Sequence, residues 1–336
     1  MNLNTFKIKK KVYYNYEKIL VIGEIGSNHD NSFNKCKRLI IEAKKAGCDA
    51  VKFQLFKSHK LLEKKHPAQK ILKKYELNTK WLKKIKKLCN QNKLLFICSP
   101  FYTEAVKLLK KCGCDAIKIA SPEIKNFTLL KEVYKSKLPV IISTGDANLK
   151  LIKRALKVFE KQNNNKIAIL HCISQYPTTE ENINLNNITI LKKEFSKINV
   201  GFSDHTIGKN AALMAVGLGA NIIEKHITLN KKNIGPDHAI SMEISTLKNL
   251  IKDIRQFSVM YGKKNKVRHK FENTVYINVF TINGQKKGTK LKLNNLICKR
   301  DFKKKVDSYE LPLLLNKTLL RDVPDDYPLK WDDIKK

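Results

Sequence analysis

Residues 115–143 read DAIKIASPEIKNFTLLKEVYKSKLPVIIS, and this stretch holds one complete repeat of the pattern that decides the fold. An apolar run, DAIKIA at 115–120, comes before an amphipathic segment, FTLLKEVYKSK, and a second apolar run, PVIIS at 139–143, comes after it. Short apolar runs predict buried strands, and a helix between two of them is the crossover that parallel strands require. The stretch therefore predicts a strand, a helix and a second strand parallel to the first.

The same alternation extends in both directions along the chain. The β-rich runs are 19–24, 49–54, 94–99, 115–120, 139–143, 167–172, 198–202 and 221–226, each followed by a helical pattern, the last at about 243–261. Eight strand–helix units over about 240 residues match the size of a closed (β/α)8 TIM barrel. An open doubly wound sheet would need a glycine-rich phosphate turn after its first strand, and GEIGSNHD is a poor match to one.

The sequence changes character after the eighth helical pattern. The charged stretch YGKKNKVRHK is typical of a linker, and the residues after it contain short strand-like runs, Asn-Gly and Lys-Gly turns and no long helical pattern. We predict a barrel domain at 1–262, a linker at 263–272 and a small β-rich domain at 273–336.

The composition is strongly basic, with 67 Lys and Arg against 30 Asp and Glu and a formal net charge of +37. Proteins that read nucleic acids favour arginine and stacked aromatic residues gathered on one face, whereas only six of these basic residues are Arg and the lysines occur in every part of the chain. A basic nucleic-acid-binding or polysaccharide-binding protein is therefore the non-enzyme alternative, and we expect no nucleic acid partner.

The location of the protein is predicted from what its sequence lacks. No apolar run approaches the roughly 20 residues that cross a bilayer, and the N-terminus has no secretory signal pattern. The eight cysteines show no paired zinc-ligand spacing, which favours reduced thiols. We expect a cytoplasmic protein without membrane attachment.

Polar residues stand at or near the end of nearly every predicted strand, which is the end where TIM barrels carry their chemistry. In chain order they are Glu24, Lys52, Gln54, Ser99, Lys118, Ser121, Glu123, Ser143, His171, Ser174, Ser203, His205 and His226. Lys52 and Lys118 lie inside apolar strands, where an unpaired charge is costly. Either they extend past the strand ends into water, or they bind an anion together with the serine hydroxyls. Two cations and several hydroxyls suit a phosphate together with a carboxylate.

His205 and His226 end adjacent strands, so their side chains can approach each other although they are far apart in sequence. Two imidazoles with open positions suit a Mn²⁺-like divalent ion better than a closed zinc site, which needs four protein ligands. His171 also closes a strand, but it lies in an apolar run and could equally be a core histidine bonded to backbone.

These segments, in this order, resemble the sialic acid synthase family, which uses phosphoenolpyruvate to make N-acetylneuraminate and related nonulosonic acids. The resemblance covers about residues 19–245 and lies in GEIGSNHDNSF, AGCDAVKFQLFK, SPFYTEAV, DAIKIASPEIKNFTLL, PVIISTGDA, ILHCISQYPT, GFSDHTIG, GANIIEKHITLN and GPDHAISME. It implies a transferase that joins phosphoenolpyruvate to an N-acyl hexosamine, such as N-acetylmannosamine, and releases phosphate.

The resemblance also implies roles for individual residues. It implies that phosphoenolpyruvate is held by Lys52, Ser99, Lys118, Ser121, Ser143, Ser174 and Ser203. It implies a divalent metal, Mn²⁺ before Mg²⁺ or Co²⁺, at His205 and His226. It places Glu24, Gln54, Glu123, Tyr176 and Asp237 around the amino sugar, with Glu24 or Glu123 transferring protons. The catalytic set is then Glu24, Glu123, Lys52 and Lys118.

The family further implies a C-terminal antifreeze-protein-like (SAF) domain that reaches over the partner's barrel in a domain-swapped homodimer. Arg300 stands where the family has an arginine that contacts the N-acyl group, although the following loop, DFKKKVDSY, departs from the family pattern. Pro122 and Asp146 are further departures, and they leave the identity of the sugar open. A related synthase that condenses phosphoenolpyruvate with a phosphorylated aldose is the alternative enzyme.

Overall fold

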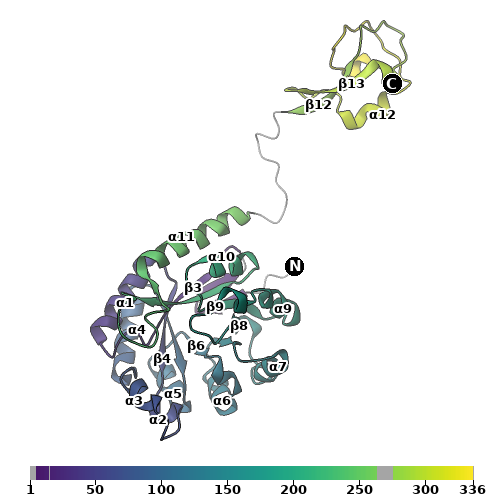
Figure 1. The fold of residues 1–336 in the computed structure, drawn as a ribbon. Helices are drawn as coiled ribbons and strands as arrows, with labels where there is room; N and C mark the ends of the chain where they lie inside the picture. Colours follow the sequence, from purple (N-terminus) through teal and green to yellow (C-terminus); the bar gives the residue numbers. More distant parts are fainter. Residues whose placement is uncertain (1–4, 15, 263–274, 336) are drawn as a thin grey trace. The chain divides into compact units, whose positions relative to one another are not determined.

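The computed structural model describes residues 5–14, 16–262 and 275–335, and its larger part is a closed barrel of parallel strands ringed by helices (Figure 1). Neighbouring strands follow one another in chain order from β3 to β10, and β10 pairs with both β9 and β3 to close the barrel. The strands are β3 (Leu20–Gly26), β4 (Ala50–Leu55), β5 (Leu95–Pro100), β6 (Ala116–Ile119), β7 (Val140–Ser143), β8 (Ile167–Cys172), β9 (Asn199–Asp204) and β10 (Ile222–Thr228). The predicted (β/α)8 TIM barrel is confirmed.

One main helix follows each barrel strand. These helices are α1 (Phe33–Ala46), α4 (Leu82–Gln91), α5 (Thr103–Lys111), α6 (Phe127–Ser136), α7 (Leu149–Lys157), α9 (Asn186–Glu194), α10 (Asn210–Gly217) and α11 (Ile244–Tyr261). Helix α1 shows why they form: the Ser32 hydroxyl accepts from the Lys35 N–H at its start, and Gly47 ends it at φ +100°. Short helices α2 (Ser58–Leu61), α3 (Ala68–Lys73) and α8 (Glu180–Ile183), and strand β11 (Met242–Glu243) beside β10, complete this part.

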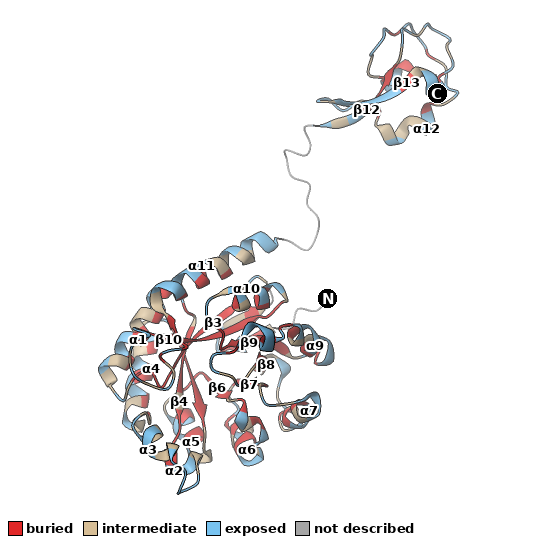
Figure 2. Ribbon diagram, viewed as in Figure 1, coloured by how far each residue is buried: buried red, intermediate tan, exposed pale blue. Residues whose placement is uncertain are grey.

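Two apolar layers fill the barrel domain, as the buried strands in Figure 2 indicate. The larger layer lies between the strands and the helices. The smaller one lies inside the barrel and contains Leu20, Ile22, Ala50, Leu95, Ile97, Ala116, Ile141, Ala168, Leu170 and Ile222. Since side chains alternate along a strand, residues two or four positions after these also face the interior.

An N-terminal hairpin closes the end of the barrel at which the parallel strands begin. The sequence analysis did not predict this hairpin. Strands β1 (Thr5–Ile8) and β2 (Lys11–Tyr14) pair antiparallel, and Phe6, Ile8 and Tyr13 join the inner apolar layer. The Thr5 carbonyl also accepts from Asn199 Nδ2 at 2.8 Å. The hairpin therefore seals the end of the barrel opposite to the carboxyl ends of the strands.

Residues 275–335 belong to a second compact unit with its own core. It contains strands β12 (Tyr276–Thr281) and β13 (Leu296–Asp301), which pair antiparallel, and one short helix, α12 (Leu311–Leu314). Its core includes Val279, Leu291, Leu319 and Ile334. The predicted linker at 263–272 lies outside the described residues, and the SAF assignment stays a prediction.

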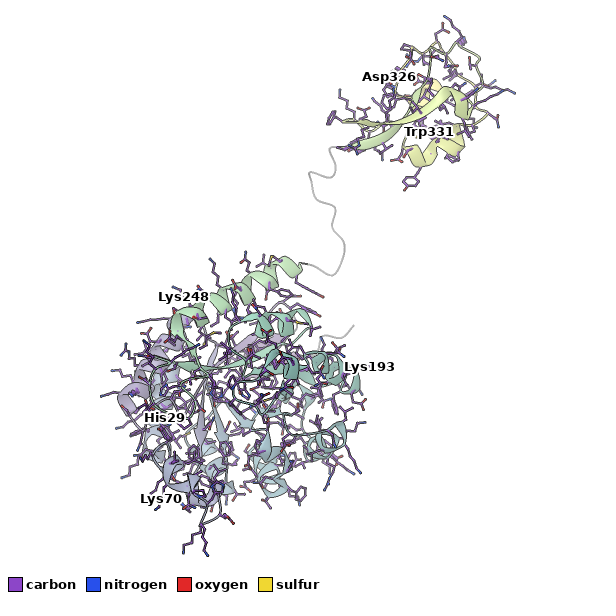
Figure 3. The ribbon with its side chains drawn as sticks, viewed as in Figure 1. His29, Lys70, Lys193, Lys248, Asp326 and Trp331 are labelled. Carbon is purple, nitrogen blue, oxygen red and sulfur yellow. The ribbon has the colours of Figure 1, made fainter. Side chains whose placement is uncertain are left out.

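The exposed lysines are spread around the barrel domain. Lys70 on α3, Lys193 on α9 and Lys248 on α11 are all exposed, and Figure 3 shows them at separate places on the rim. Within residues 5–14, 16–262 and 275–335, no helix has the combination of length and apolar character needed to cross a membrane.

Candidate active site

Strand register brings the predicted site residues together inside the barrel. On β10, Ile222 belongs to the inner apolar layer, so Glu224 and His226 also face the interior. His226 lies opposite Glu24 on β3, and Glu24 lies opposite Lys52 on β4. The apolar layer near the hairpin therefore gives way to a polar layer near the carboxyl ends of the strands.

A cluster of two lysines and two carboxylates lies in this polar layer. Glu224 Oε1 is 3.0 Å from Lys52 Nζ and 3.2 Å from Lys118 Nζ. Lys52 Nζ is also 3.3 Å from Glu24 Oε1, and the Ser203 hydroxyl donates to Glu224 Oε1 at 2.9 Å. Lys52 is 4% exposed and Lys118 is 2% exposed, so the alternative in which these lysines extend into water is wrong.

The charges in this lysine–carboxylate cluster depend on one another. Burial opposes the charge of Lys52, but the carboxylates of Glu224 and Glu24 outweigh it and raise the pKa of the ammonium. Burial lowers the pKa of Lys118, and the nearby charge of Glu224 offsets only part of this decrease. Despite burial, Lys118 and Lys52 hold the pKa of Glu224 well below its usual range. The free site is thus nearly balanced in charge.

Several buried polar atoms at this level lack a partner among the described residues. They are Glu24 Oε2, Glu224 Oε2 and Ser143 Oγ. Buried polar groups in folded proteins are nearly always hydrogen-bonded, so unpartnered atoms gathered in one place point to a ligand or water that binds there. The polar layer therefore has unpartnered polar atoms that a bound polar molecule would satisfy.

The remaining serines approach from the strand ends on the other side of the barrel. Gly145 follows β7, and its N–H donates to Ser121 Oγ at 3.1 Å. A Cβ atom on Gly145 would lie 2.8 Å from both Ser121 Oγ and Ser174 Oγ, so both hydroxyls lie next to Gly145. Ser99 Oγ lies 3.5 Å from Lys52 Nζ, at the limit of a hydrogen bond. The structure thus places Ser99 and Ser203 at the lysine–carboxylate cluster, and Ser121 and Ser174 beside Gly145 after β7.

The side chains of His205 and His226 point toward each other with their rings in an edge-to-face contact, and the ring centroids are 5.5 Å apart. His205 Nδ1 lies 2.8 Å from the Ile173 carbonyl oxygen and must donate to it, which leaves the Nε2 lone pair available. Burial lowers the pKa of both rings, which favours the neutral form that a metal requires. The Tyr176 ring lies over His205 at 4.1 Å and is half exposed, so it forms the outer wall.

The two histidines fit a metal site with open positions better than a closed one. His226 Nδ1 is buried without a hydrogen-bond partner and lies 3.9 Å from Asp237 Oδ2. In the part of the chain that the structure describes, no group of three His, Cys, Asp or Glu residues has a metal-binding arrangement. Substrate oxygens or water would have to complete the coordination of an ion held here.

Three residues predicted for the sugar lie around Gly26, which has φ +52° at the end of β3. A Cβ atom there would lie 2.8 Å from Asp237 Oδ2, 3.3 Å from Gln54 Nε2 and 3.4 Å from Glu24 Oε1. Gln54 Nε2 donates to Glu24 at 2.8 Å, and the Ser27 N–H and hydroxyl donate to Asp237 at 3.1 and 2.8 Å. Only glycine leaves room for this arrangement.

Two further predicted residues are less closely connected to the site. Glu123 lies in the short turn after β6 and accepts from Asn126 Nδ2 at 2.8 Å, and burial raises the pKa of its carboxyl. Arg300 is exposed on β13 and belongs to the second unit.

His171 belongs to the outer layer of the barrel, which settles the alternative left open by the sequence. Its Nε2 lies 2.7 Å from the Ile183 carbonyl oxygen, and its ring stacks on Phe202 with centroids 5.7 Å apart. Sequence reasoning missed Glu224 and the glycines 26 and 145. Glu224 could have been found, because it stands two residues before His226 in IIEKH and must share its face of the strand.

Comparisons with known proteins identify the family of this chain. A model of the NeuB family matches residues 39–266. The N,N'-diacetyllegionaminic acid synthase of Campylobacter jejuni is 38% identical over 307 residues, which cover 84% of this chain and 91% of that protein. A Methanocaldococcus jannaschii protein of uncharacterised function is 36% identical over 322 residues, 95% of each chain.

Solved structures show the same likeness. The N-acetylneuraminic acid synthetase of Leptospira borgpetersenii superposes with a TM-score of 0.76 at 31% identity, and the match covers 80% of this chain and 94% of that one. The Bacillus subtilis spore coat polysaccharide biosynthesis protein SpsE superposes with a TM-score of 0.70 at 30% identity over 99% of each chain.

Proposed function

Because the chain belongs to the NeuB family of nonulosonic acid synthases, we propose that it condenses phosphoenolpyruvate with an N-acyl hexosamine, such as N-acetylmannosamine. The products would be a sialic or related nonulosonic acid and phosphate. The observation that carries the proposal is the buried cluster of Lys52, Lys118 and Glu224 beneath the facing rings of His205 and His226.

The lysine–carboxylate cluster suits phosphoenolpyruvate because this substrate carries a phosphate and a carboxylate on the same carbon atom. Two ammonium groups that already converge on one carboxylate oxygen of Glu224 can receive an anion without a large rearrangement. Ser99 and Ser203 contact this cluster, and the hydroxyls of Ser121, Ser143 and Ser174 at the neighbouring strand ends would donate to the remaining oxygens of the substrate. A low-dielectric site makes each of these contacts stronger than it would be in water.

His205 and His226 would hold a divalent ion, with Mn²⁺ favoured over Mg²⁺ or Co²⁺. Such an ion supplies Lewis-acid polarisation of the sugar's aldehyde oxygen. Ile173 fixes the tautomer of His205 through its carbonyl, and Tyr176 covers that ring from the outside. Asp237, fixed by Ser27, stands at the His226 side of the site.

The reaction forms a bond between the methylene carbon of phosphoenolpyruvate and the aldehyde carbon of the sugar. The aldehyde oxygen gains a proton as it becomes a hydroxyl. Water then adds to the carbon that bears the phosphate, and a carboxylate accepts one proton of that water. The carbon–oxygen bond to phosphate breaks as the added hydroxyl becomes a carbonyl, and the second proton leaves with the phosphate. Glu24 is better placed for this proton transfer than Glu123, because Glu24 contacts Lys52 and Gln54 within the site and its Oε2 has no partner among the described residues.

The sugar side of the site favours an acyl amino sugar without a phosphate. The groups that surround Gly26 are the carboxylates of Glu24 and Asp237 and the amide of Gln54. A phosphorylated aldose would require cations there, and the lysines that follow β4 and β6 are already paired: Lys57 with Glu76, Lys60 with Glu104 and Lys125 with Asp146. We therefore place the aldose-phosphate alternative second.

Phosphate release from phosphoenolpyruvate, measured with a panel of sugars, tests the proposal directly. We expect release with N-acetylmannosamine or a 2,4-diacetamido hexose in the presence of Mn²⁺. Release only with phosphorylated aldoses would favour the alternative enzyme, and no release with any sugar would contradict the proposal.

The proposal extends to a homodimer in which Arg300 contacts the sugar bound by the partner. An Arg300→Ala variant should then raise the sugar KM without changing the phosphoenolpyruvate KM.

A further inference from the structure

An ion pair lies directly behind the two facing histidines, on the outer side of the barrel wall. Lys225 and Asp204 are paired in the ladder between β10 and β9, one residue before His226 and His205 respectively. Because side chains alternate, both point away from the interior while the histidines point into it. Lys225 and Asp204 are each 1% exposed.

The contacts of this ion pair reach beyond the end of the sheet. Lys225 Nζ lies 2.7 Å from Asp204 Oδ2 and donates to the Thr206 carbonyl oxygen at 2.6 Å. Asp204 Oδ1 accepts from the Thr206 N–H and hydroxyl, both at 2.8 Å. Thr206 is thus held at its N–H, its hydroxyl and its carbonyl by the two charged side chains.

These contacts fix His205 where the ladder no longer does. The pairing between β9 and β10 stops at Asp204 and Lys225, so His205 lies just past the last rung. Its position is set instead from both sides: Thr206 is bound to the ion pair, and the His205 carbonyl accepts from the Thr178 N–H at 3.0 Å. Lys225 precedes His226, so the same ammonium group connects the backbones that carry the two rings.

Stability alone does not account for a charged pair at this position. The neighbouring outward-facing residues of β10 are Ile223 and Ile227, both fully buried in the layer between strands and helices. Burying two charges is expensive, and apolar residues of similar volume often serve stability equally well or better. A polar connection that spans two strand ends is better explained by the geometry that it imposes.

We propose that Lys225 and Asp204 are positioning residues that set the spacing of His205 and His226 for a divalent ion. The inference rests on the metal site of the proposed function. Groups behind metal ligands commonly control affinity in this way, and their loss weakens metal binding by about 10–100-fold.

The test measures Mn²⁺ binding to the full chain by the electron paramagnetic resonance signal of the free ion. We expect Lys225→Met to weaken Mn²⁺ affinity by about 10–100-fold. Lys86→Met is the matched control, since Lys86 forms a buried ion pair with Asp115 at 2.6 Å away from the histidines. We expect the control to lose stability while it keeps wild-type Mn²⁺ affinity.

A second variant covers the possibility that Lys225→Met does not fold. Asp204→Asn retains an oxygen for Thr206 but removes the charge, and it should weaken Mn²⁺ binding in the same direction. Wild-type Mn²⁺ affinity in the folded Lys225 or Asp204 variants, or equal loss in Lys86→Met, would overturn the inference and leave the proposed function standing. Absence of Mn²⁺ binding by the wild-type chain would overturn the metal site itself, and the inference with it.

Discussion

Replacing Glu224 with alanine should make the stability of the barrel depend on phosphoenolpyruvate. Glu224 accepts from Lys52, Lys118 and Ser203 through one oxygen, and of these only Lys52 has a second carboxylate contact, with Glu24. Its loss leaves two buried ammonium groups with too little compensating charge. At about 3 Å and an effective dielectric constant of about 20, each lost attraction is on the order of 5 kcal/mol before the desolvation of Glu224 itself is returned. Broken buried ion pairs cost about 3–5 kcal/mol in practice, and we expect that decrease in the free energy of unfolding.

The substrate should reverse part of this loss, because its anionic groups take the place of the missing carboxylate. A ligand at about 100 times its Kd contributes about 2.7 kcal/mol, and each tenfold gain in affinity adds about 1.4 kcal/mol. Urea unfolding with and without phosphoenolpyruvate, in the presence of a chelator, measures the difference. The substrate should therefore stabilise Glu224→Ala by more than it stabilises the wild type.

Asp115→Ala is the control for this experiment. Asp115 also binds two lysines, Lys9 and Lys86, each at 2.6 Å, but it lies near the hairpin end of the barrel. Its variant should be destabilised without any added response to phosphoenolpyruvate. The reasoning is refuted if phosphoenolpyruvate stabilises Glu224→Ala no more than the wild type, or if it rescues Asp115→Ala equally well.

The remaining predictions concern the serines, the metal ligands and the hairpin. Gly145→Ala should raise the phosphoenolpyruvate KM by at least about tenfold, or about 1.4 kcal/mol, because its Cβ would displace Ser121, Ser174 and the Cys172 carbonyl. Gly217→Ala, where the added Cβ meets nothing within 4 Å, is its control, and equal KM values in both variants would contradict the assignment. His226→Ala should abolish turnover while circular dichroism stays unchanged, and full activity in chelator would disprove the metal site. Phe6→Ala should lower the free energy of unfolding by about 3–5 kcal/mol in urea denaturation. A loss below about 1 kcal/mol would show that the hairpin does not seal the inner layer.

The barrel was predictable because strands of a parallel sheet are buried on both faces and therefore appear as continuous apolar runs. The run predicted at 139–143 is β7 at Val140–Ser143, and the run at 167–172 is β8. The two lysines were visible for the same reason, since a charge inside an apolar run is conspicuous. Because the strands that carry them belong to one closed barrel, the sequence also predicted that the two lysines share one site.

Features that depend on contacts between distant segments were not predictable from local pattern. The hairpin sequence TFKIKKKVYY is rich in lysine, and only its packing against the inner layer shows that Phe6 and Tyr13 are core residues. The crowding around Gly145 involves Ser121 and Ser174, which lie on different strand ends. Glu224 was visible in the sequence, but its importance depends on the register that aims it at Lys52 and Lys118.

The hairpin closes the end of the barrel opposite to the carboxyl ends of the strands, and this restricts the route by which reactants can reach the interior. With Phe6, Ile8 and Tyr13 packed across that end, we expect molecules to reach the polar layer from the carboxyl ends of the strands. A molecule that binds beside Lys118 has to pass His205 and Tyr176, which lie nearer the carboxyl ends of the strands. We expect a larger molecule bound at His205 and Tyr176 to block that route. We therefore expect the reactant that binds beside Lys118 to bind before the reactant that binds at His205 and Tyr176.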